Sequence, residues 1–348
     1  MSFARKINKA VLKTADKLIP VTKKELRFLE SVLEKRFLNF GVEPTNLCNA
    51  ACPFCAYRFS KTAKKVMPLE LYKKAVEEYS FLGGGGMALT PTIGEPLMDK
   101  TIIEKVKIAR NYPNIGNIFF YTNLINLDQF DITELLLSGI SRISVSTAIG
   151  SKEMYARLFG ADKYDIVFKN LMKLLETNKK LANPVNIILA LRFDKNFDLY
   201  NSADYNKVSK MIDKKKITKL PNDRGYDNWG GVIEEKDLPK DTKFRESKKD
   251  RSEPCAELYR RINVLANGDV NFCVCRDFDY EMVIGNISDN DLIGLWQGDK
   301  LRKLRENWKK GNMPAICRNC SNYAPLSNFL KKSRIAIWSL AKCIRRGH

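Results

Sequence analysis

The sequence predicts an α/β fold in which a partial (β/α)6 barrel is followed by a small C-terminal β-hairpin and helix domain, with helical termini. Three observations carry this prediction. Short apolar segments alternate with longer amphipathic ones from about residue 38 to residue 193. A turn-forming Ala-Asn-Gly-Asp segment at 266–269 separates two later apolar segments, and both ends of the chain show apolar residues at helical spacing. At 348 residues the chain is long enough for one large domain and a smaller one.

Residues 1–37 are expected to form basic amphipathic helices. Apolar residues from Phe3 to Leu18 recur every three or four positions, with lysines between them. Thr22 followed by Glu25 is typical of a helix capping box, and an apolar stripe continues behind it. A second helix is therefore predicted to run to about Phe37.

Residues 38–235 are expected to form the barrel. The predicted strands are Phe40–Glu43, Met87–Thr90, Asn117–Thr122, Arg142–Thr147 and Val185–Phe193. The predicted helices between them include Leu69–Tyr79, Asp99–Asn111 and Tyr164–Asn178. Because each crossover is long, the strands should be parallel with the helices outside. About six such units suit an incomplete barrel better than a closed eightfold one.

The region 200–254 is rich in Lys, Asp, Asn and Gly and shows little periodicity, so we interpret it as connecting and substrate-facing structure. Asn228-Trp229-Gly230-Gly231 is its one distinctive segment, and Asp223, Arg224, Tyr226 and Asn228 are its candidate substrate contacts.

Residues 236–325 should form the second domain, with a hairpin from segments 263–265 and 270–273 and a helix over about Leu292–Lys309. Residues 326–348 should form a basic amphipathic C-terminal helix.

Composition excludes several classes of chemistry. The single histidine is the last residue, His348, so a reaction that needs an internal histidine has no candidate. Nine clustered cysteines are too few, and odd in number, for a secreted disulfide scaffold. The sequence shows no signal peptide and no apolar run long enough to span a membrane, which favours a cytoplasmic protein. The net charge of +20 favours acidic partners.

Cys48, Cys52 and Cys55 follow the first predicted strand with C-x3-C-x2-C spacing. Three close thiolates can hold one face of an iron-sulfur cube and leave the fourth iron open to an external ligand. This motif, with Phe54 before the third cysteine, resembles the radical S-adenosylmethionine (SAM) superfamily. A zinc knuckle would call for a nearby fourth cysteine or a histidine, and neither is present.

The resemblance implies a [4Fe–4S] cluster that binds and cleaves SAM, and it extends along the barrel. Gly94-Glu95-Pro96 matches the family's GGEP element, with Ile93 in place of its first glycine. Ser146-Thr147 departs from the Asp-Gly that the family often has there. By the family pattern, the residues expected to contact SAM are Phe54, Tyr57, Gly94, Glu95, Pro96, Thr122, Asn123, Ser144, Ser146 and Arg192.

A second set of cysteines lies in the C-terminal part. Cys255 and Cys273 flank Gly268 in a C-x12-G-x4-C arrangement, and Cys317 and Cys320 form a C-x2-C pair. This set resembles the twitch domain, the shortened form of the SPASM domain, which implies one auxiliary [4Fe–4S] cluster. A structural zinc ion is the alternative that the spacing leaves open.

Cys275 lies two residues after one of these cysteines and could donate a hydrogen atom to a substrate radical, as a cysteine does in some peptide epimerases of the superfamily. A buried cysteine that only packs is the alternative.

The basic termini allow a second kind of contact. From Asn307 to His348 there are nine Lys or Arg residues and no acidic residue, with an apolar stripe and Trp338 among them. Such helices favour peripheral binding to an anionic membrane, while packing on the barrel is the alternative. No nucleic-acid binding is expected, because no stacking aromatics interleave a basic stripe.

The sequence thus predicts a radical SAM oxidoreductase, similar to the family's aminocyclitol alcohol dehydrogenase type. Its substrate would be a small or lipid-linked, anionic molecule that is oxidised or epimerised at a carbinol carbon of a sugar or cyclitol. An external donor such as flavodoxin or ferredoxin would supply electrons. The alternatives are an enzyme that modifies a ribosomally made peptide and a non-catalytic iron-sulfur electron carrier.

Overall fold

The computed structural model describes residues 20–90, 92–212, 217–220, 225–247, 250–273 and 276–345. Most of the predicted N-terminal helix, at residues 1–19, lies outside the described residues. So do three candidate site residues, Asp223, Arg224 and Cys275.

One open sheet organises the molecule. Within the described residues, nine strands pair in the order β6-β5-β4-β3-β2-β1-β7-β8-β9. The strands are β1 (Asn39–Val42), β2 (Gly85–Ala88), β3 (Ile115–Thr122), β4 (Arg142–Thr147), β5 (Asn186–Leu191), β6 (Ile217–Leu220), β7 (Arg261–Val264), β8 (Asp269–Asn271) and β9 (Val283–Asn286). All pairs from β6 to β7 are parallel, while β8 and β9 add antiparallel strands. The C-terminal hairpin therefore extends the sheet of the barrel.

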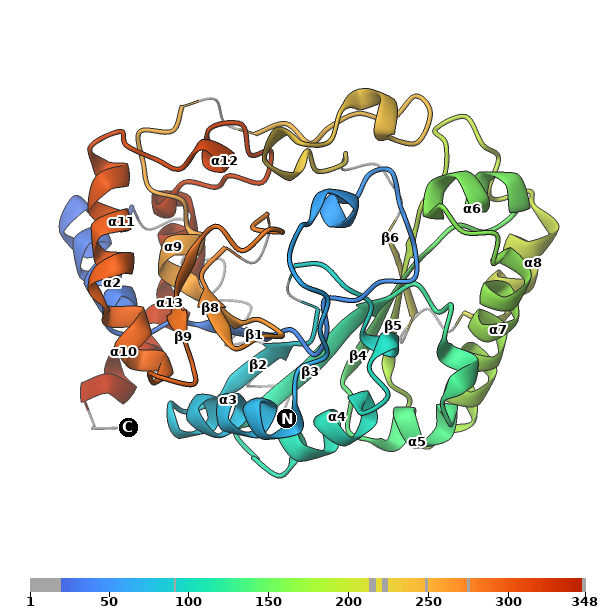
Figure 1. Ribbon diagram of the computed structural model, residues 1–348, viewed down its shortest axis with the longest axis horizontal. Helices are drawn as coiled ribbons and strands as arrows, with labels where there is room; N and C mark the ends of the chain where they lie inside the picture. The colour runs from blue at the N-terminus through green and yellow to red at the C-terminus, as the bar shows by residue number, and fades with distance from the viewer. Residues whose placement is uncertain are drawn as a thin grey trace.

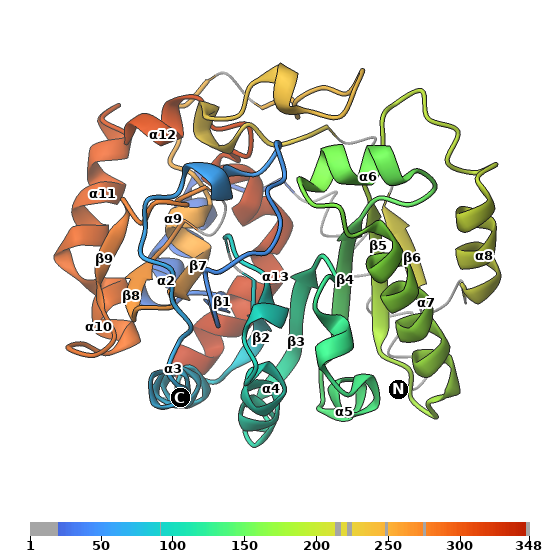
Figure 2. The same ribbon diagram turned by 45° about the vertical axis from the view of Figure 1, so that its right-hand side comes forward.

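Helices cover the outer face of the parallel strands (Figures 1 and 2). They are α3 (Leu69–Phe81), α4 (Ile102–Arg110), α5 (Ile132–Leu137), α7 (Tyr164–Lys180) and α8 (Ala203–Met211). α6 (Lys152–Phe159) lies instead at the strand ends, where Phe159 O accepts from Ala51 N at 2.9 Å. Each has one apolar face; α7, for example, buries Val167, Leu171 and Leu174. Burying such stripes against the strands stabilises the barrel and leaves the carboxyl ends of the strands at one edge.

A second group of helices surrounds the C-terminal strands: α2 (Lys23–Lys35), α9 (Glu257–Arg260), α10 (Leu292–Gln297), α11 (Asp299–Lys309), α12 (Ala315–Arg318) and α13 (Leu326–Arg345). The Thr22 side chain caps α2 by accepting a hydrogen bond from Glu25 N at 3.1 Å, as the sequence predicts. Buried Trp296 donates from Nε1 to Leu33 O at 2.8 Å, which ties α10 to α2. α13 packs along α2, with the ring centroids of Phe28 and Trp338 4.4 Å apart.

Two predictions of secondary structure were wrong. The region 200–254 is not merely connecting structure, because it contains α8, which follows β5, and β6, the sixth strand of the barrel. α8 buries only Tyr205 and Val208, so its apolar pattern in the sequence is weak. The predicted helix over Leu292–Lys309 is two helices, since Gly298 takes an extended conformation, with ψ of 162°, between α10 and α11.

A buried ion pair holds the strand edge where the first cysteine loop ends. Lys105 Nζ of α4 lies 2.5 Å from Asp99 Oδ2 and donates to Met67 O at 2.7 Å. The Lys105 side chain is fully buried and that of Asp99 is 1% exposed. Removing one partner of such a pair costs about 3–5 kcal/mol of stability, because the other charge is left buried.

Candidate active site at the strand ends

The loop between β1 and α3 carries the first three cysteines and is closed at its base. Asn46 Nδ2 donates to Ala63 O at 3.0 Å, and Lys65 N donates to Asn46 Oδ1 at 2.7 Å. Glu95 N, on the neighbouring strand-end loop, donates to Leu47 O at 2.7 Å. Hydrogen bonds from the rest of the chain therefore hold the loop at both ends.

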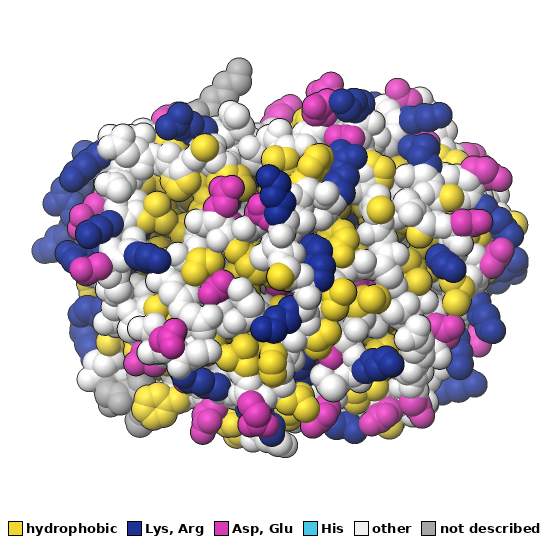
Figure 3. All heavy atoms as spheres, viewed as in Figure 1, with side chains coloured by type: hydrophobic (Ala, Val, Ile, Leu, Met, Phe, Trp, Pro, Cys, Tyr) yellow, Lys and Arg dark blue, Asp and Glu magenta, His cyan; other side chains and the backbone are white. Residues whose placement is uncertain are grey.

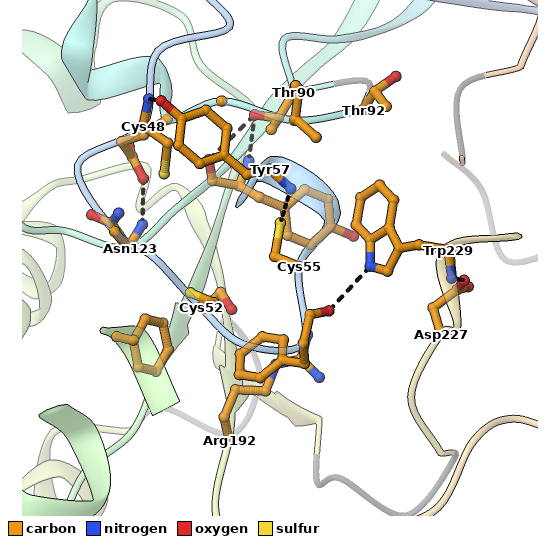
Figure 4. Close-up of a pocket in the computed structure, with 18 of the residues that line it drawn as sticks. Cys48, Cys52, Cys55, Tyr57, Thr90, Thr92, Asn123, Arg192, Asp227 and Trp229 are labelled. Atoms are coloured by element: carbon orange, nitrogen blue, oxygen red, sulfur yellow. Dashed lines mark hydrogen bonds between the residues drawn. The ribbon is translucent and has the colours of Figure 1, made fainter. Parts of the chain in front are cut away.

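Three thiols of this loop face one cavity of about 430 Å³ (Figure 4). Cys48, Cys52 and Cys55 are partly buried and form no disulfide. The short helix η1 (Ala56–Phe59) turns the loop so that Tyr57 Oη accepts from Cys48 N at 3.0 Å and Tyr57 N donates to Cys55 Sγ at 3.5 Å. Burial raises the pKa of Cys48 to about 12, so a bound metal would have to displace a proton there.

Gly94 brings a second loop against the first. Its φ is +96°, and a Cβ at this position would lie 2.3 Å from Thr45 O. No residue with a side chain fits there without moving the backbone. The Gly94-Glu95 backbone therefore lies at the cavity wall, beside the cysteine loop.

The Glu95 carboxylate is buried beneath the cavity and ties two strand ends together. Its Oε1 accepts from Thr122 Oγ1 at 2.7 Å and its Oε2 accepts from Asn123 N at 2.6 Å. Burial is the largest influence on this group and raises its pKa to about 7, although these hydrogen bonds oppose the shift. Asn123 Nδ2 in turn donates to Asn49 Oδ1 at 2.8 Å, which joins the end of β3 to the cysteine loop.

The structure brings most of the candidate SAM contacts to this cavity. Those that line it are Phe54, Tyr57, Gly94, Glu95, Thr122, Asn123, Ser146 and Arg192. Ser144 and Pro96 are buried and are not among the lining residues. The guanidinium carbon of Arg192 lies 5.9 Å from the centre of the Phe54 ring and 5.4 Å from that of Tyr226.

Several lining residues were not singled out by the sequence analysis: Thr90, Thr92, Tyr121, Asp227, Arg245 and Arg276. Thr90 and Tyr121 lie near the ends of β2 and β3, where the rule that parallel strands share one edge could have found them. No sequence pattern marks Arg245 or Arg276. Of the candidate substrate contacts, Tyr226 lines the cavity, whereas Asn228 bonds to the second cysteine region.

The second set of cysteines meets in a separate, mainly apolar cavity. Cys255, Cys273, Cys317 and Cys320 line it together with Phe272, Trp308 and Tyr323. Burial raises the pKa of Cys255 to about 12 and raises that of Cys317 further. Four thiols from three segments of the chain, in a mainly apolar site, match the donors of a fully ligated iron-sulfur cluster.

No three His, Cys, Asp or Glu side chains within the described ranges are arranged around a point that could hold a single metal ion. An iron-sulfur cube takes one thiolate at each iron, so its cysteines need not meet at one point. Cys343, on α13, is exposed and takes part in neither set.

Comparison with known protein families agrees with this arrangement. The radical SAM superfamily matches residues 42–194, the segment that carries the first cysteine loop and strands β2 to β5. This chain carries a radical SAM domain. An iron-sulfur cluster-binding domain, SPASM, matches residues 255–321, which span the second cysteine set. The predicted resemblances to the radical SAM superfamily and to the SPASM domain are confirmed, and the second match favours iron-sulfur over zinc at the second set.

Two curated proteins show how far the similarity extends. The S-adenosyl-L-methionine-dependent 2-deoxy-scyllo-inosamine dehydrogenase of Niallia circulans is 24% identical over 297 residues, which cover 83% of this chain and 95% of that enzyme. The GTP 3′,8-cyclase of Clostridium perfringens strain 13 is 27% identical over 169 residues, covering 47% of this chain and 51% of that enzyme. The likeness to the cyclase is thus confined to about half of each chain.

Solved structures share the fold. BtrN in complex with AdoMet and 2-DOIA superimposes with a TM-score of 0.57 at 23% identity, covering 84% of this chain and 96% of BtrN. Streptococcus suis SuiB bound to its precursor peptide SuiA gives 0.54 at 13% identity, covering 84% and 73%. The predicted α/β fold is confirmed. The cofactors of this radical SAM enzyme are SAM and two iron-sulfur clusters.

Proposed function

We propose that this enzyme oxidises a carbinol carbon of a cyclitol, a sugar or a lipid-linked sugar to a ketone. The observation that carries the proposal is that the two cysteine cavities share a wall, since Arg276 lines both of them. A site that removes hydrogen therefore adjoins one that can accept an electron. The dehydrogenase from Niallia circulans, similar over 95% of its length, supports the same reaction class.

Within this proposal, Cys48, Cys52 and Cys55 hold the [4Fe–4S] cluster that binds SAM, and Cys255, Cys273, Cys317 and Cys320 hold an auxiliary [4Fe–4S] cluster. When bound, the first cluster and SAM supply a 5′-deoxyadenosyl radical that removes the hydrogen atom from the carbinol carbon. The remaining electron and the hydroxyl proton must then leave before the ketone forms.

The residues of the chain orient SAM around the thiols. The backbone of Gly94 and Glu95 lies at the cavity wall, and Arg192 suits a bidentate contact with the methionine carboxylate. Phe54, Tyr57, Thr122, Asn123 and Ser146 supply the remaining contacts from the cavity surface. We leave Pro96 and Ser144 out of the contacting set because they are buried outside the cavity lining.

An anionic substrate suits the part of the cavity that SAM does not take. Arg245, which is exposed, lines the cavity, and the whole chain carries a net charge of +20. Arg276 also lines the cavity but is paired with Asp227. A guanidinium group such as that of Arg245 binds phosphate well. A phosphorylated sugar or a sugar linked to a lipid through phosphate fits this surface.

The function is tested with anaerobic holoenzyme, dithionite, SAM and a panel of free, phosphorylated and lipid-linked sugars and cyclitols. We expect one substrate to yield 5′-deoxyadenosine and a ketone in equal amounts. Turnover of a short peptide instead would support peptide modification, and an inverted alcohol would support epimerisation. A protein that makes no 5′-deoxyadenosine with any reductant would be an electron carrier, against the proposal.

We propose a flavodoxin or ferredoxin as the physiological reductant, since such carriers are acidic and this surface is basic. Figure 3 shows Lys and Arg gathered at the edge formed by α11 and α2. The exposed ones on these two helices include Lys23, Lys24, Arg27, Lys35, Arg302, Lys303 and Lys309. Within the described residues, no helix is long and apolar enough to cross a bilayer.

We further propose that the enzyme, in the cytoplasm, rests on the inner face of an anionic membrane through the outer face of α13. The side of α13 that carries Leu330 and Ile337 is buried against the protein. On the opposite side of the helix, Lys331, Lys332 and Trp338 are exposed. Cations around an exposed tryptophan fit an anionic interface.

Because α13 packs along α2, substitutions test membrane contact better than deletion does. The variant with Lys331→Glu and Lys332→Glu should lose pelleting with phosphatidylglycerol vesicles. The matched control, Lys179→Glu and Lys180→Glu in exposed positions of α7, should keep it. Equal pelleting of both variants would contradict the membrane contact.

A further inference from the structure

The segment Asp227–Gly231 joins the two cysteine loops. On one side, Asn228 Nδ2 donates to Asn319 O at 2.7 Å, within the Cys317–Cys320 loop, and Asn228 N donates to Ser321 Oγ at 3.0 Å. On the other side, Trp229 Nε1 donates to Phe54 O of the first cysteine loop at 3.1 Å (Figure 4). The one distinctive segment of the irregular region is therefore a bridge between the two sites.

The glycines of this segment permit its close packing. Gly230 has a φ of +74°, and a Cβ there would lie 2.3 Å from Ile316 Cγ1, next to Cys317. Glycine is needed because both the backbone conformation and the contact exclude a side chain. The bridge is thus seated directly on the second cysteine loop.

Arg276 completes the bridge. Its guanidinium carbon lies 4.8 Å from the centre of the Trp229 ring, and it forms an ion pair with Asp227. The side chains of Arg276 and Asp227 are each only 12% exposed. Arg276 lines the first cavity and the second, so it stands in the wall between them.

The charge of Arg276 acts on both cysteine sets. Burial is the main influence on this guanidinium and lowers its pKa to about 10, so it stays protonated at neutral pH. Cys320 of the second set and Cys55 of the first are the thiols that interact with it electrostatically. Arg251 adds a second positive charge near Cys317, whereas Glu257 near Cys255 and Asp277 near Cys317 add negative ones.

We propose that Arg276 is a positioning residue whose positive charge raises the reduction potential of the auxiliary cluster. Together with Trp229, it also holds in place the part of the protein that separates the two cavities, which an electron from the substrate must cross. A cluster becomes more negative when it gains an electron, so a nearby buried cation stabilises its reduced form. Asp227 orients Arg276 and partly offsets its charge. This inference rests on the proposed role of the second cluster as electron acceptor.

The test is an EPR-monitored redox titration of the full-length holoenzyme without substrate. Arg276→Gln should shift the midpoint potential of the auxiliary cluster to a lower value, and Arg276→Lys, which keeps the charge, should shift it less. Asp227→Asn should shift it upward, because it removes a negative charge. Lys152→Gln, which removes one positive charge from the exposed surface of α6, should leave it unchanged.

Equal potentials in wild type and Arg276→Gln would overturn the proposal. So would equal downward shifts in the Gln and Lys variants, since the charge would then have no effect of its own. If Arg276→Gln lowers the iron content of the protein, Asp227→Asn still decides the matter through the opposite sign of its predicted shift. The titration needs no substrate, so the Arg276 result stands even if no carbinol is found to be oxidised.

Discussion

The two cysteine sites differ in what surrounds their sulfur atoms. The first takes three thiols from one loop and opens into a cavity lined with polar strand ends, including Thr122, Asn123 and Arg192. The second takes four thiols from three segments of the chain and surrounds them with Phe272, Trp308 and Tyr323. An open ligand position allows chemistry on a bound molecule, and a closed one suits electron transfer. The difference indicates that the two sites divide one reaction between them.

The largest expected effect comes from breaking the first site. Cys52→Ala should lower the reductive formation of 5′-deoxyadenosine to the uncatalysed background, because the cluster would then lack one of its three thiolate ligands. The measurement is 5′-deoxyadenosine by liquid chromatography under dithionite. The matched control, Cys343→Ala on the exposed face of α13, should behave as wild type. Wild-type cleavage in the Cys52 variant would contradict the role of the first site.

Breaking the second site should separate the two halves of the reaction. Cys317→Ala should keep 5′-deoxyadenosine formation within about tenfold of wild type but lose the oxidised product, because the electron has no acceptor. The ratio of product to 5′-deoxyadenosine is the quantity to measure. A ratio equal to that of wild type would show that the second site takes no part in the oxidation.

A smaller effect is expected from the buried carboxyl below the first site. The pKa of Glu95 is about 7 in the folded protein against an ordinary value of 4.5. The folded state therefore binds more protons between these values, and the free energy of unfolding falls as pH rises through this window. Glu95→Gln does not titrate.

From pH 6 to pH 8, wild type should lose about 1 kcal/mol of stability relative to the Glu95→Gln variant. Anaerobic thermal melts of both proteins at each pH check this. A constant difference in Tm between them would mean that the carboxyl is already ionised at pH 6.

The smallest expected effect is a loss of stability when a hydrogen bond within the first cysteine loop is removed. Tyr57→Phe removes the oxygen that accepts from Cys48 N, which should cost about 1 kcal/mol and leave the iron content of the second site intact. Anaerobic melts and iron analysis of the variant report this. A Tyr57→Phe variant as stable as wild type would show that another group takes over this backbone hydrogen bond.

The sequence predicted the barrel well where its strands are buried and apolar. Predicted and observed strands agree at Arg142–Thr147, and the helix at Leu69–Phe81 was placed to within two residues. The unit formed by α8 and β6 was missed because α8 buries only Tyr205 and Val208, too few for a clear stripe. The apolar pattern of a sequence predicts a buried helix only when one face of the helix is apolar along most of its length.

In the candidate site, too, some residues could be predicted from the sequence and others could not. The short C-x3-C-x2-C and C-x2-C spacings can be recognised in the sequence, because thiols only a few residues apart can bind one cluster. Cys255 and Cys273 lie far from Cys317 in the sequence, and the resemblance to the twitch domain grouped them. Trp229 and Arg276 act through partners far away in sequence, such as Phe54, and no local pattern records such a contact. The Asn228–Gly231 segment could be noticed in the sequence, but its role needs the Cys317–Cys320 loop beside it.

The measurement that tests the account most directly is the EPR spectrum of the reduced holoenzyme with and without SAM. Wild type should show two cluster signals, and SAM should alter only one of them. That signal should be absent from the variant with Cys48, Cys52 and Cys55 all changed to Ala, and the remaining signal should not respond to SAM. A response to SAM in that triple variant, or a single signal in wild type, would contradict the division of the reaction between an open and a closed cluster.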